Sequence, residues 1–552
     1  MRVARLVAVV VIMAATVAAG IVQSAAPAGA TVVKPFGREY SGRIYGDFLT
    51  IGNTVLVCPA GDTKCTEVME RKSSTGNNND FDMQYADGAR ALAGYDSSTS
   101  RIAIPPGATV AWARLDWGGN TGAYVLGKSR LRRCDASAPA NAVPPAGSPE
   151  SAKILLKVGS QPAGQVDPET VETTPDTESG PHYYTATADV LSALSKAPTG
   201  HDVDVSVADL WAPTGYGCVG GWSLTVVYQY PRPNPEYAPS ARAVYVYEGH
   251  VLQRSNDPAT TTGISGFQVG AEGAIRAGVT AYEGDYNVSG SRFAVNGRLI
   301  ANPDRPDAGT SKFFDSYAAG TVAPDFPNNM SVDAKDFDIP AGIVPLGSTD
   351  ATLTFSTKGD TYLVQSFAFS VPIPDELITQ TPVPAEVGPG QTIDYGITVD
   401  NGVDVAEHDA EFTTHLAPVL TDAVYEDARA SAGTLHYEAP DLVWKGSLRP
   451  GQRVTIDIQV KTITDPRANA RLREYIIGEG AIMGCQHGRG PGCSAVTELE
   501  KPVTVPCDAV LVGGSAIAAP SMRSGSFTRA DGAAAGGARV DLTPQRPGAP
   551  AC

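Results

Sequence analysis

Residues 453–461 read Arg-Val-Thr-Ile-Asp-Ile-Gln-Val-Lys, with polar and apolar side chains in alternation. Residues 392–400 (Thr-Ile-Asp-Tyr-Gly-Ile-Thr-Val-Asp) follow the same pattern. Residues 222–230 (Trp-Ser-Leu-Thr-Val-Val-Tyr-Gln-Tyr) also place large apolar side chains on one face at a period of two. Successive side chains of a strand point to opposite faces of its sheet, so the pattern is typical of antiparallel strands with one buried and one solvated face.

The composition extends this prediction to the whole chain. Its 552 residues include 58 glycines and 42 prolines, which favour many short strands joined by turns. Turn clusters such as Pro105-Pro106-Gly107 and Pro450-Gly451 lie between the strand patterns. The sequence therefore predicts an all-β protein built from tandem β-sandwiches, and the length is sufficient for several domains.

Proline-rich segments suggest where the domains meet. Residues 231–239 carry four prolines among polar residues, and residues 371–376 form a second such segment. From Gly513 the chain is rich in Gly, Ala, Ser and Pro, a composition that cannot bury enough surface to fold. We predict sandwich-like domains at 31–236 and 237–377, a third at 378–505, and a flexible, disordered tail at 506–552.

The first thirty residues have the features of a secretory leader. Arg2 and Arg5 precede an apolar run from Leu6 to Val22, and Ala28-Gly29-Ala30 fits the small-residue cleavage rule. The sequence predicts a signal peptide at 1–30, cleaved between Ala30 and Thr31; a retained N-terminal anchor is the alternative. We expect no transmembrane span after its removal, because no other apolar run is long enough. The protein is predicted to be secreted or associated with the cell surface.

Eight cysteines agree with an oxidising compartment, where an even number favours disulfides. Sequence proximity favours two short loops, Cys58 with Cys65 and Cys485 with Cys493. Cys134 with Cys218 would join distant parts of the first domain, and Cys507 with Cys552 remains as the weakest pairing. A zinc site is the competing interpretation, but no Cys-x2-Cys motif is present.

The formal net charge of −17 argues against nucleic acid as a partner. Acidic residues also gather in two short segments, and hard cations such as calcium prefer oxygen ligands. Calcium is therefore a hypothesis, while a solvated acidic face is the more ordinary interpretation. The candidate ligands are Asp80, Asp82, Asp333, Asp336 and Asp338.

Several motifs of the last domain occur together in one known family. These are residues 381–395 (Thr-Pro-Val-Pro-Ala-Glu-Val-Gly-Pro-Gly-Gln-Thr-Ile-Asp-Tyr), 399–402 (Val-Asp-Asn-Gly) and 442–452 (Leu-Val-Trp-Lys-Gly-Ser-Leu-Arg-Pro-Gly-Gln). Residues 380–503 thus resemble the bacterial conserved-repeat domain called domain of unknown function eleven, an Ig-like module of surface proteins. The preceding region, with Gly52–Cys58 and Gly221–Tyr228, resembles the β-rich N-terminal part of exported actinobacterial proteins. The resemblance implies an adhesin-like surface protein without catalysis.

The sequence lacks the common catalytic motifs, which agrees with that implication. The sequence contains no Gly-x-Ser-x-Gly and no His-Glu-x-x-His, and its seven histidines are scattered. We therefore predict a non-catalytic structural or adhesive protein without a cofactor, which binds a surface protein or a glycan. A secreted glycan-binding protein is the alternative, because Tyr245 and Tyr247 share one strand face, although such pairs are usually core. An uncharacterised secreted hydrolase is the third hypothesis.

Overall fold

The computed structural model describes residues 31–499, apart from 90–91, 93, 137, 256, 270–272, 375, 381–382, 405, 465–470 and 479–492. Almost every regular element is a strand, so the predicted all-β class is confirmed. Two short α-helices, α1 (Thr63–Met69) and α2 (Leu191–Leu194), and two 3-10 turns, η1 (Asn78–Asp80) and η2 (Pro306–Ala308), interrupt the strands. Within the described residues no helix has the length and hydropathy to cross a membrane. The predicted leader and tail lie outside these residues, and Thr31 is the first residue of β1.

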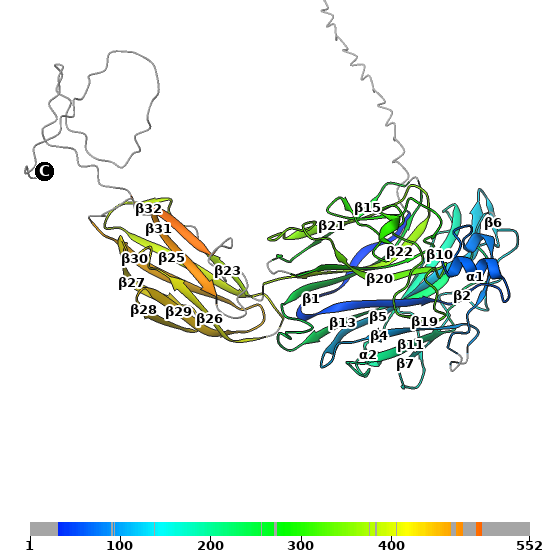
Figure 1. Cartoon of the computed structure of the whole chain (residues 1–552), viewed down its shortest axis with the longest axis horizontal. Helices are drawn as coiled ribbons and strands as arrows, with labels where there is room; N and C mark the ends of the chain where they lie inside the picture. Colours follow the sequence, from blue (N-terminus) through cyan, green and yellow to red (C-terminus); the bar gives the residue numbers. More distant parts are fainter. Residues whose placement is uncertain are drawn as a thin grey trace, which may run out of the picture.

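A 10-stranded sheet organises the N-terminal unit, which comprises β1 to β22 (Figure 1). Its central strand β1 pairs with β14 through its first half and with β13 through its second half, and the pairs along the sheet are antiparallel. Strand β6 pairs with β5 beside the main order. In sheet order the strands are β20 (Val332–Ile339), β16 (Ile275–Tyr282), β22 (Tyr362–Pro372), β14 (Arg242–Gln253), β1 (Thr31–Thr54), β13 (Gly220–Tyr230), β5 (Thr109–Leu126), β10 (Gly180–Asp189) and β9 (Thr170–Thr173), with β6 (Ser129–Leu131).

Smaller sheets complete the N-terminal unit, and their apolar side chains join those of the large sheet in one core. The first contains β19 (Thr321–Ala323), β4 (Ser97–Ala103), β11 (Asp202–Ala208), β7 (Ile154–Val158) and β8 (Gly164–Val166). The second contains β12 (Gly215–Tyr216), β3 (Asp82–Tyr85) and β2 (Leu56–Val57). The third contains β15 (Thr260–Ser265), β21 (Asp350–Ser356), β17 (Arg292–Val295) and β18 (Arg298–Leu299).

The predicted boundary at residue 236 is wrong. Strands from 237–377 form one half of the 10-stranded sheet and strands from 31–236 form the other half. The two halves are continuous, because β13 and β14 both pair with β1. The proline-rich residues 231–239 therefore connect two strands of one sheet. Proline excludes a central strand but is equally compatible with a linker and a long connection, so composition alone could not separate the two.

The solvated face predicted for residues 222–230 is also wrong, because β13 is buried on both faces. Its polar face lies against β16, where the Ser223 and Thr280 hydroxyls are 2.7 Å apart. Ser366 of β22 likewise donates a hydrogen bond to Asp116 of β5 at 2.7 Å. These strands are not neighbours in the sheet order, so the sheet curls over and encloses a hydrogen-bonded polar layer.

A second core begins at Ile378 and belongs to the C-terminal sandwich, which comprises β23 to β32. Tyr395 and Trp444 are its largest buried side chains, and the alternation predicted for β25 and β30 is confirmed by their burial. One sheet contains β23 (Glu376–Gln380), β25 (Thr392–Asn401), β30 (Arg453–Thr462) and β27 (Ala423–Ala430). The other contains β24 (Glu386–Val387), β32 (Ser494–Leu499), β31 (Arg471–Gly478), β26 (Glu407–His415), β29 (Asp441–Leu448) and β28 (Thr434–Glu438).

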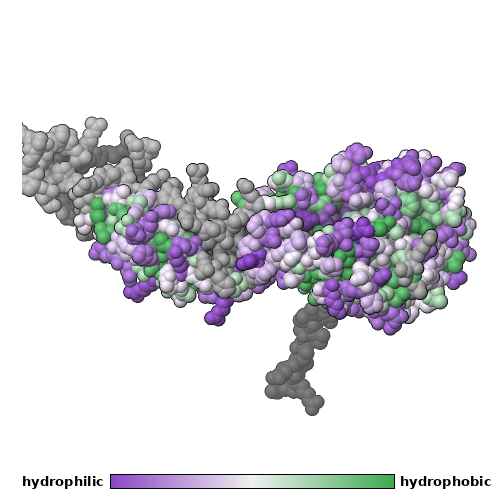
Figure 2. Space-filling model, turned by 60° about the horizontal axis from the view of Figure 1, so that its bottom comes forward, coloured by the Kyte–Doolittle hydropathy of each residue, from purple (hydrophilic) through white to green (hydrophobic). Residues whose placement is uncertain are grey.

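The two units lie end to end along the longest axis of the molecule (Figure 1). On the face drawn in Figure 2, hydrophobic residues form small patches separated by hydrophilic ones. Such a mixed surface is usual for a folded protein in water.

Candidate functional site

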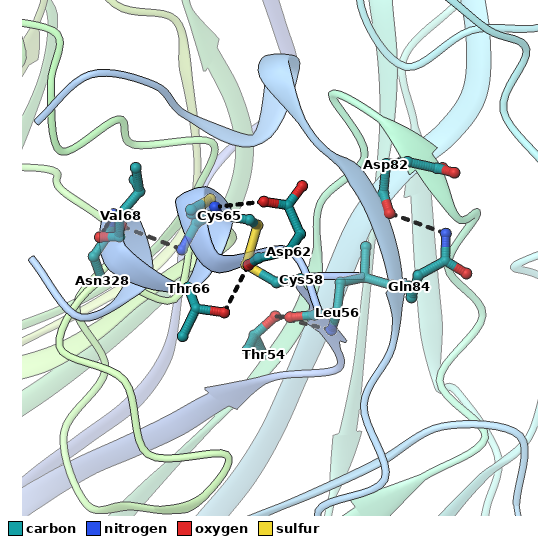
Figure 3. Close-up of a disulfide and its surroundings, with 11 residues drawn as sticks. Thr54, Leu56, Cys58, Asp62, Cys65, Thr66, Val68, Asp82, Gln84 and Asn328 are labelled. Carbon is teal, nitrogen blue, oxygen red and sulfur yellow. Dashed lines mark hydrogen bonds between the residues drawn. A yellow bond between two sulfur atoms is a disulfide. The ribbon is translucent and has the colours of Figure 1, made fainter. Parts of the chain in front are cut away.

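A capped helical loop surrounds the first disulfide (Figure 3). Cys58 and Cys65 are bonded with a Cα–Cα distance of 5.6 Å, and Cys65 lies in α1. The Asp62 carboxylate caps α1 by accepting the N–H of Cys65 at 3.0 Å. The side-chain amide of Asn328 donates to the Val68 carbonyl at 3.1 Å. This contact fastens the loop to a segment that is distant in sequence.

The second disulfide joins Cys134 and Cys218, which are 84 positions apart and both buried. Cys493 is buried and disulfide-bonded as well. Cys485, Cys507 and Cys552 lie outside the described residues, so their predicted pairings stay predictions.

Replacing Cys134 and Cys218 together by alanine is expected to lower the free energy of unfolding by about 4 kcal/mol, because a long loop gains freedom in the unfolded chain. The matched double alanine variant of Cys58 and Cys65 opens a loop of separation 7 and should lose less, about 2–3 kcal/mol. Urea denaturation followed by tryptophan fluorescence measures both losses. An equal or smaller loss for the long loop would contradict the expectation.

The first two predicted calcium ligands have separate roles. Asp80 ends η1, where its carboxylate accepts the N–H of Asn77 at 3.2 Å and completes a capping box. Asp82 is exposed at the start of β3. The segment is thus stabilised locally by its own acidic and amide side chains.

The other three candidates lie on two faces of β20. Asp333 is fully buried and lies 3.1 Å from the Lys335 ammonium, whereas Asp336 and Asp338 pair with Arg276. The structure does not gather the five carboxylates, and the solvated-face interpretation is wrong for Asp333. Within the described part of the chain, no group of three or more His, Cys, Asp or Glu side chains is placed to hold a metal ion.

The sequence analysis missed a cluster of buried acids, Glu283, Asp285 and Asp360, which we call the carboxylate cluster. All three are less than a tenth exposed. The Asn77 amide donates to the Asp285 carboxylate at 2.7 Å, and the Asp285 N–H donates to Asp360 at 2.6 Å. Among the described residues none of the three forms an ion pair. Burial raises the pKa of Asp285 to about 7, and burial with the neighbouring carboxylates raises the pKa values of Glu283 and Asp360.

The tyrosines proposed for sugar stacking are mainly core residues. Tyr245 and Tyr247 are 4% and 8% exposed, and the Tyr247 ring stacks on Phe367 at a centroid distance of 4.9 Å. The core interpretation of this pair is therefore confirmed, and an exposed stacking surface is not present at these two side chains, although Tyr245 also lines a cavity described below.

The two units meet where residues 402–404 of the C-terminal sandwich contact β1. The Asp404 N–H donates to the Arg43 carbonyl at 2.9 Å, and the Arg43 N–H donates to the Asp404 carboxylate at 2.8 Å. The Arg43 guanidinium also donates to the carbonyls of Gly402 and Gly266. Val403 is 1% exposed and packs within the core of the N-terminal unit. These contacts fix the two units to each other.

A cavity of about 290 Å³ opens at this contact, and we call it the junction pocket. Strands β1 and β14 supply most of its lining, and the turn after β15 and the 402–404 segment close it. Its lining residues are Arg38, Ser41, Gly42, Arg43, Tyr245, Gly266 and Asp404.

A histidine–aspartate pair lies in another hollow, of about 440 Å³, on the outer face of the C-terminal sandwich. His415 Nδ1 is 2.7 Å from the Asp441 carboxylate, and His436 and Glu438 line the same hollow. Register brings these residues together, since β26 and β28 both pair with β29. Spacing along the sequence gave no signal for them.

One family model matches the chain. Residues 379–495 match the model described as a domain of unknown function, DUF7927. This range nearly coincides with residues 380–503, whose motifs resemble the conserved-repeat domain. The matching model carries a different description. The finer assignment to the conserved-repeat domain therefore stays a prediction. No curated protein matches the sequence.

Solved structures resemble the chain only distantly. A putative membrane-anchored protein from Corynebacterium diphtheriae aligns with 9% identity over 84% of this chain and 97% of its own, with a TM-score of 0.17. The N-terminal domain of a Streptococcus gordonii adhesin aligns with 12% identity over 73% and 94%, with a TM-score of 0.18. A peptide-N(4)-(N-acetyl-β-D-glucosaminyl)asparagine amidase aligns with 14% identity over 59% and 97%, also with a TM-score of 0.18. Similarity at this level carries no argument about function.

Proposed function

We propose that the protein is an exported, non-catalytic structural or adhesive protein that acts by binding at the surface of a Gram-positive, actinobacterium-like cell. The observation that carries the proposal is the junction between the units. Val403 is inserted into the N-terminal core. The Asp404 N–H donates to the Arg43 carbonyl, and the Arg43 N–H donates to the Asp404 carboxylate. Such a junction makes the large unit and the Ig-like sandwich one elongated body, which suits a protein that holds a binding surface away from its attachment.

The disulfides support the compartment. Both described pairs lie in the N-terminal unit, one closing a short capped loop and one joining buried residues far apart in sequence. Stable disulfides of this kind form in oxidising environments, which agrees with the leader predicted at 1–30. Binding residues on such scaffolds usually lie in loops and at unit boundaries.

A secreted hydrolase is the second candidate, and the His415–Asp441 pair is the observation that favours it. An aspartate that orients a histidine is half of a general-base arrangement. A nucleophile or an activated water would have to complete it. We rank this candidate lower because the pair lies on an open sheet face, with both side chains about one-third exposed.

The proposal is tested by fractionating producing cells and measuring the intact mass of the mature protein, reduced and non-reduced. We expect it on washed cells, beginning at Thr31, with its cysteines oxidised. Release into the medium with several free thiols would contradict both the adhesive function and the disulfides.

The same preparation separates the two candidates. A panel of ester, peptide and glycoside substrates should give no turnover above that of a His415→Ala variant. Turnover that is lost in this variant would replace the adhesive proposal by the hydrolase.

A further inference from the structure

The junction pocket contains polar groups that the protein itself does not use. The Arg38 guanidinium, the Ser41 hydroxyl and the Tyr245 hydroxyl line it, and none forms a hydrogen bond or ion pair with another described residue. Arg43 differs, since its guanidinium is held by two backbone carbonyls. The pocket therefore combines a fixed cation with a free cation and two free hydroxyls.

The charge in the pocket is opposite to that of the protein. Arg38 and Arg43 bring two positive charges, in a chain with a net charge of −17. Asp404 is the only acid in the lining, and its carboxylate already accepts the Arg43 N–H. Both arginines are also close enough to the Tyr245 hydroxyl to lower its pKa, although burial has the larger effect and raises it. Tyr245 therefore remains a neutral donor.

The size and chemistry of the pocket restrict the class of ligand that it can bind. A cavity of about 290 Å³ lies near the small end of ligand pockets, so it suits a single ring or a short polar group. A guanidinium matches the geometry of a carboxylate or sulfate and can bind it through two hydrogen bonds. Ser41, Tyr245 and the Gly266 backbone can meet the hydroxyls of a sugar, and the tyrosine adds an apolar edge.

We propose that the junction pocket binds a sugar residue that bears a carboxylate or a sulfate, as found in acidic glycans. Arg38 would pair with the oxyanion, while Ser41 and Tyr245 would orient the ring. The inference rests on the proposed adhesive function and names the ligand class of its binding surface. The binding surface would then lie at the contact between the units. Because both units line the pocket, a bound ligand would stabilise their contact.

The test is binding of the full mature protein to an array of glucuronate-containing, sialylated, sulfated and neutral glycans. We expect retention on acidic glycans only, weakening as salt is raised. Arg38→Ala and Tyr245→Phe should each weaken binding at least tenfold, and Arg38→Lys should recover part of the loss. Arg298→Ala is the matched control, because Arg298 is exposed on β18 away from the pocket lining.

The results of this array distinguish a carboxylate from a sulfate as the bound group, and they also decide whether the pocket binds acidic glycans at all. Preference for uronate or sialate assigns a carboxylate, and preference for sulfated glycans assigns a sulfate. Equal loss in Arg298→Ala, equal binding of neutral glycans, or no binding at all would overturn the inference. Failure of the proposed function is distinguishable, because the cell fractionation does not depend on the pocket.

Discussion

Raising the pH from about 6.5 to about 8.5 is expected to lower the free energy of unfolding by on the order of 3 kcal/mol. The loss comes from carboxyl groups that are buried without enough positive charge. Burial raises the pKa of Asp285 to about 7, and burial together with Asp116 raises the pKa of Glu248 to about 8. An unfolded chain would ionise both near pH 4.

The sign follows from proton binding. Between the unfolded and the folded pKa values, the folded protein holds protons on these carboxyls that the unfolded chain has released. Stability therefore falls as pH rises through that window. His250 acts in the opposite direction at lower pH, because burial lowers its pKa to about 3 and the unfolded imidazole gains its proton below about 6.5. The chosen window lies above that opposing range.

Urea denaturation at a series of pH values measures the slope. Asp285→Asn and Glu248→Gln should each flatten it, since the amides do not ionise. Asp189→Asn is the control, because Asp189 is exposed at the end of β10 and should leave the slope unchanged. A slope that is flat in the parent protein, or that both core variants leave unaltered, would show that these carboxyls do not hold protons in the folded state.

The local alternation of polar and apolar residues was enough to predict the strands of the C-terminal sandwich. The alternation at 392–400 and 453–461 matches the burial of β25 and β30, because each strand has one face on a single core. The same pattern at 222–230 predicted a solvated face that does not exist, because the second face of β13 is covered by strands from later in the chain. Serine and threonine look solvated in a sequence, yet they bury readily when hydroxyls from another strand satisfy them.

The candidate sites could not be predicted for the same reason, because strand pairing between distant segments brings their residues together. Asp80 was singled out for its neighbours in sequence, but Asn77 meets Asp285 from more than two hundred residues away. Arg38, Ser41 and Tyr245 lie together because β1 pairs with β14, and of the three only Tyr245 belongs to a pattern that the sequence alone makes a candidate for binding. Lys335 lies between two of the predicted calcium ligands, Asp333 and Asp336, and its positive charge was a sequence signal against a cation at these carboxylates.

Replacing Lys335 by methionine is expected to cost about 3–5 kcal/mol, which is the usual penalty for removing one partner from a buried ionic group. The ammonium is 1% exposed and lies 3.1 Å from both Asp304 and Asp333 and 3.4 Å from Asp315. It also donates to the Phe313 carbonyl at 2.9 Å. Burial alone would lower the pKa of Lys335, but these acids raise it, so the side chain is charged.

Methionine keeps most of the volume but removes the charge and the N–H donors, including the bond to the Phe313 carbonyl. The carboxylates that remain account for the part of the loss that a second substitution can recover. Arg71 and Arg305 approach Asp315, which leaves Asp304 and Asp333 as the unbalanced pair. The Asp304→Asn change in the Lys335→Met background should therefore recover part of the loss, a coupling that a double-mutant cycle measures. Lys358→Met, at an exposed lysine, is the control. A Lys335→Met loss no larger than that of the control would mean that Lys335 does not stabilise these buried carboxylates.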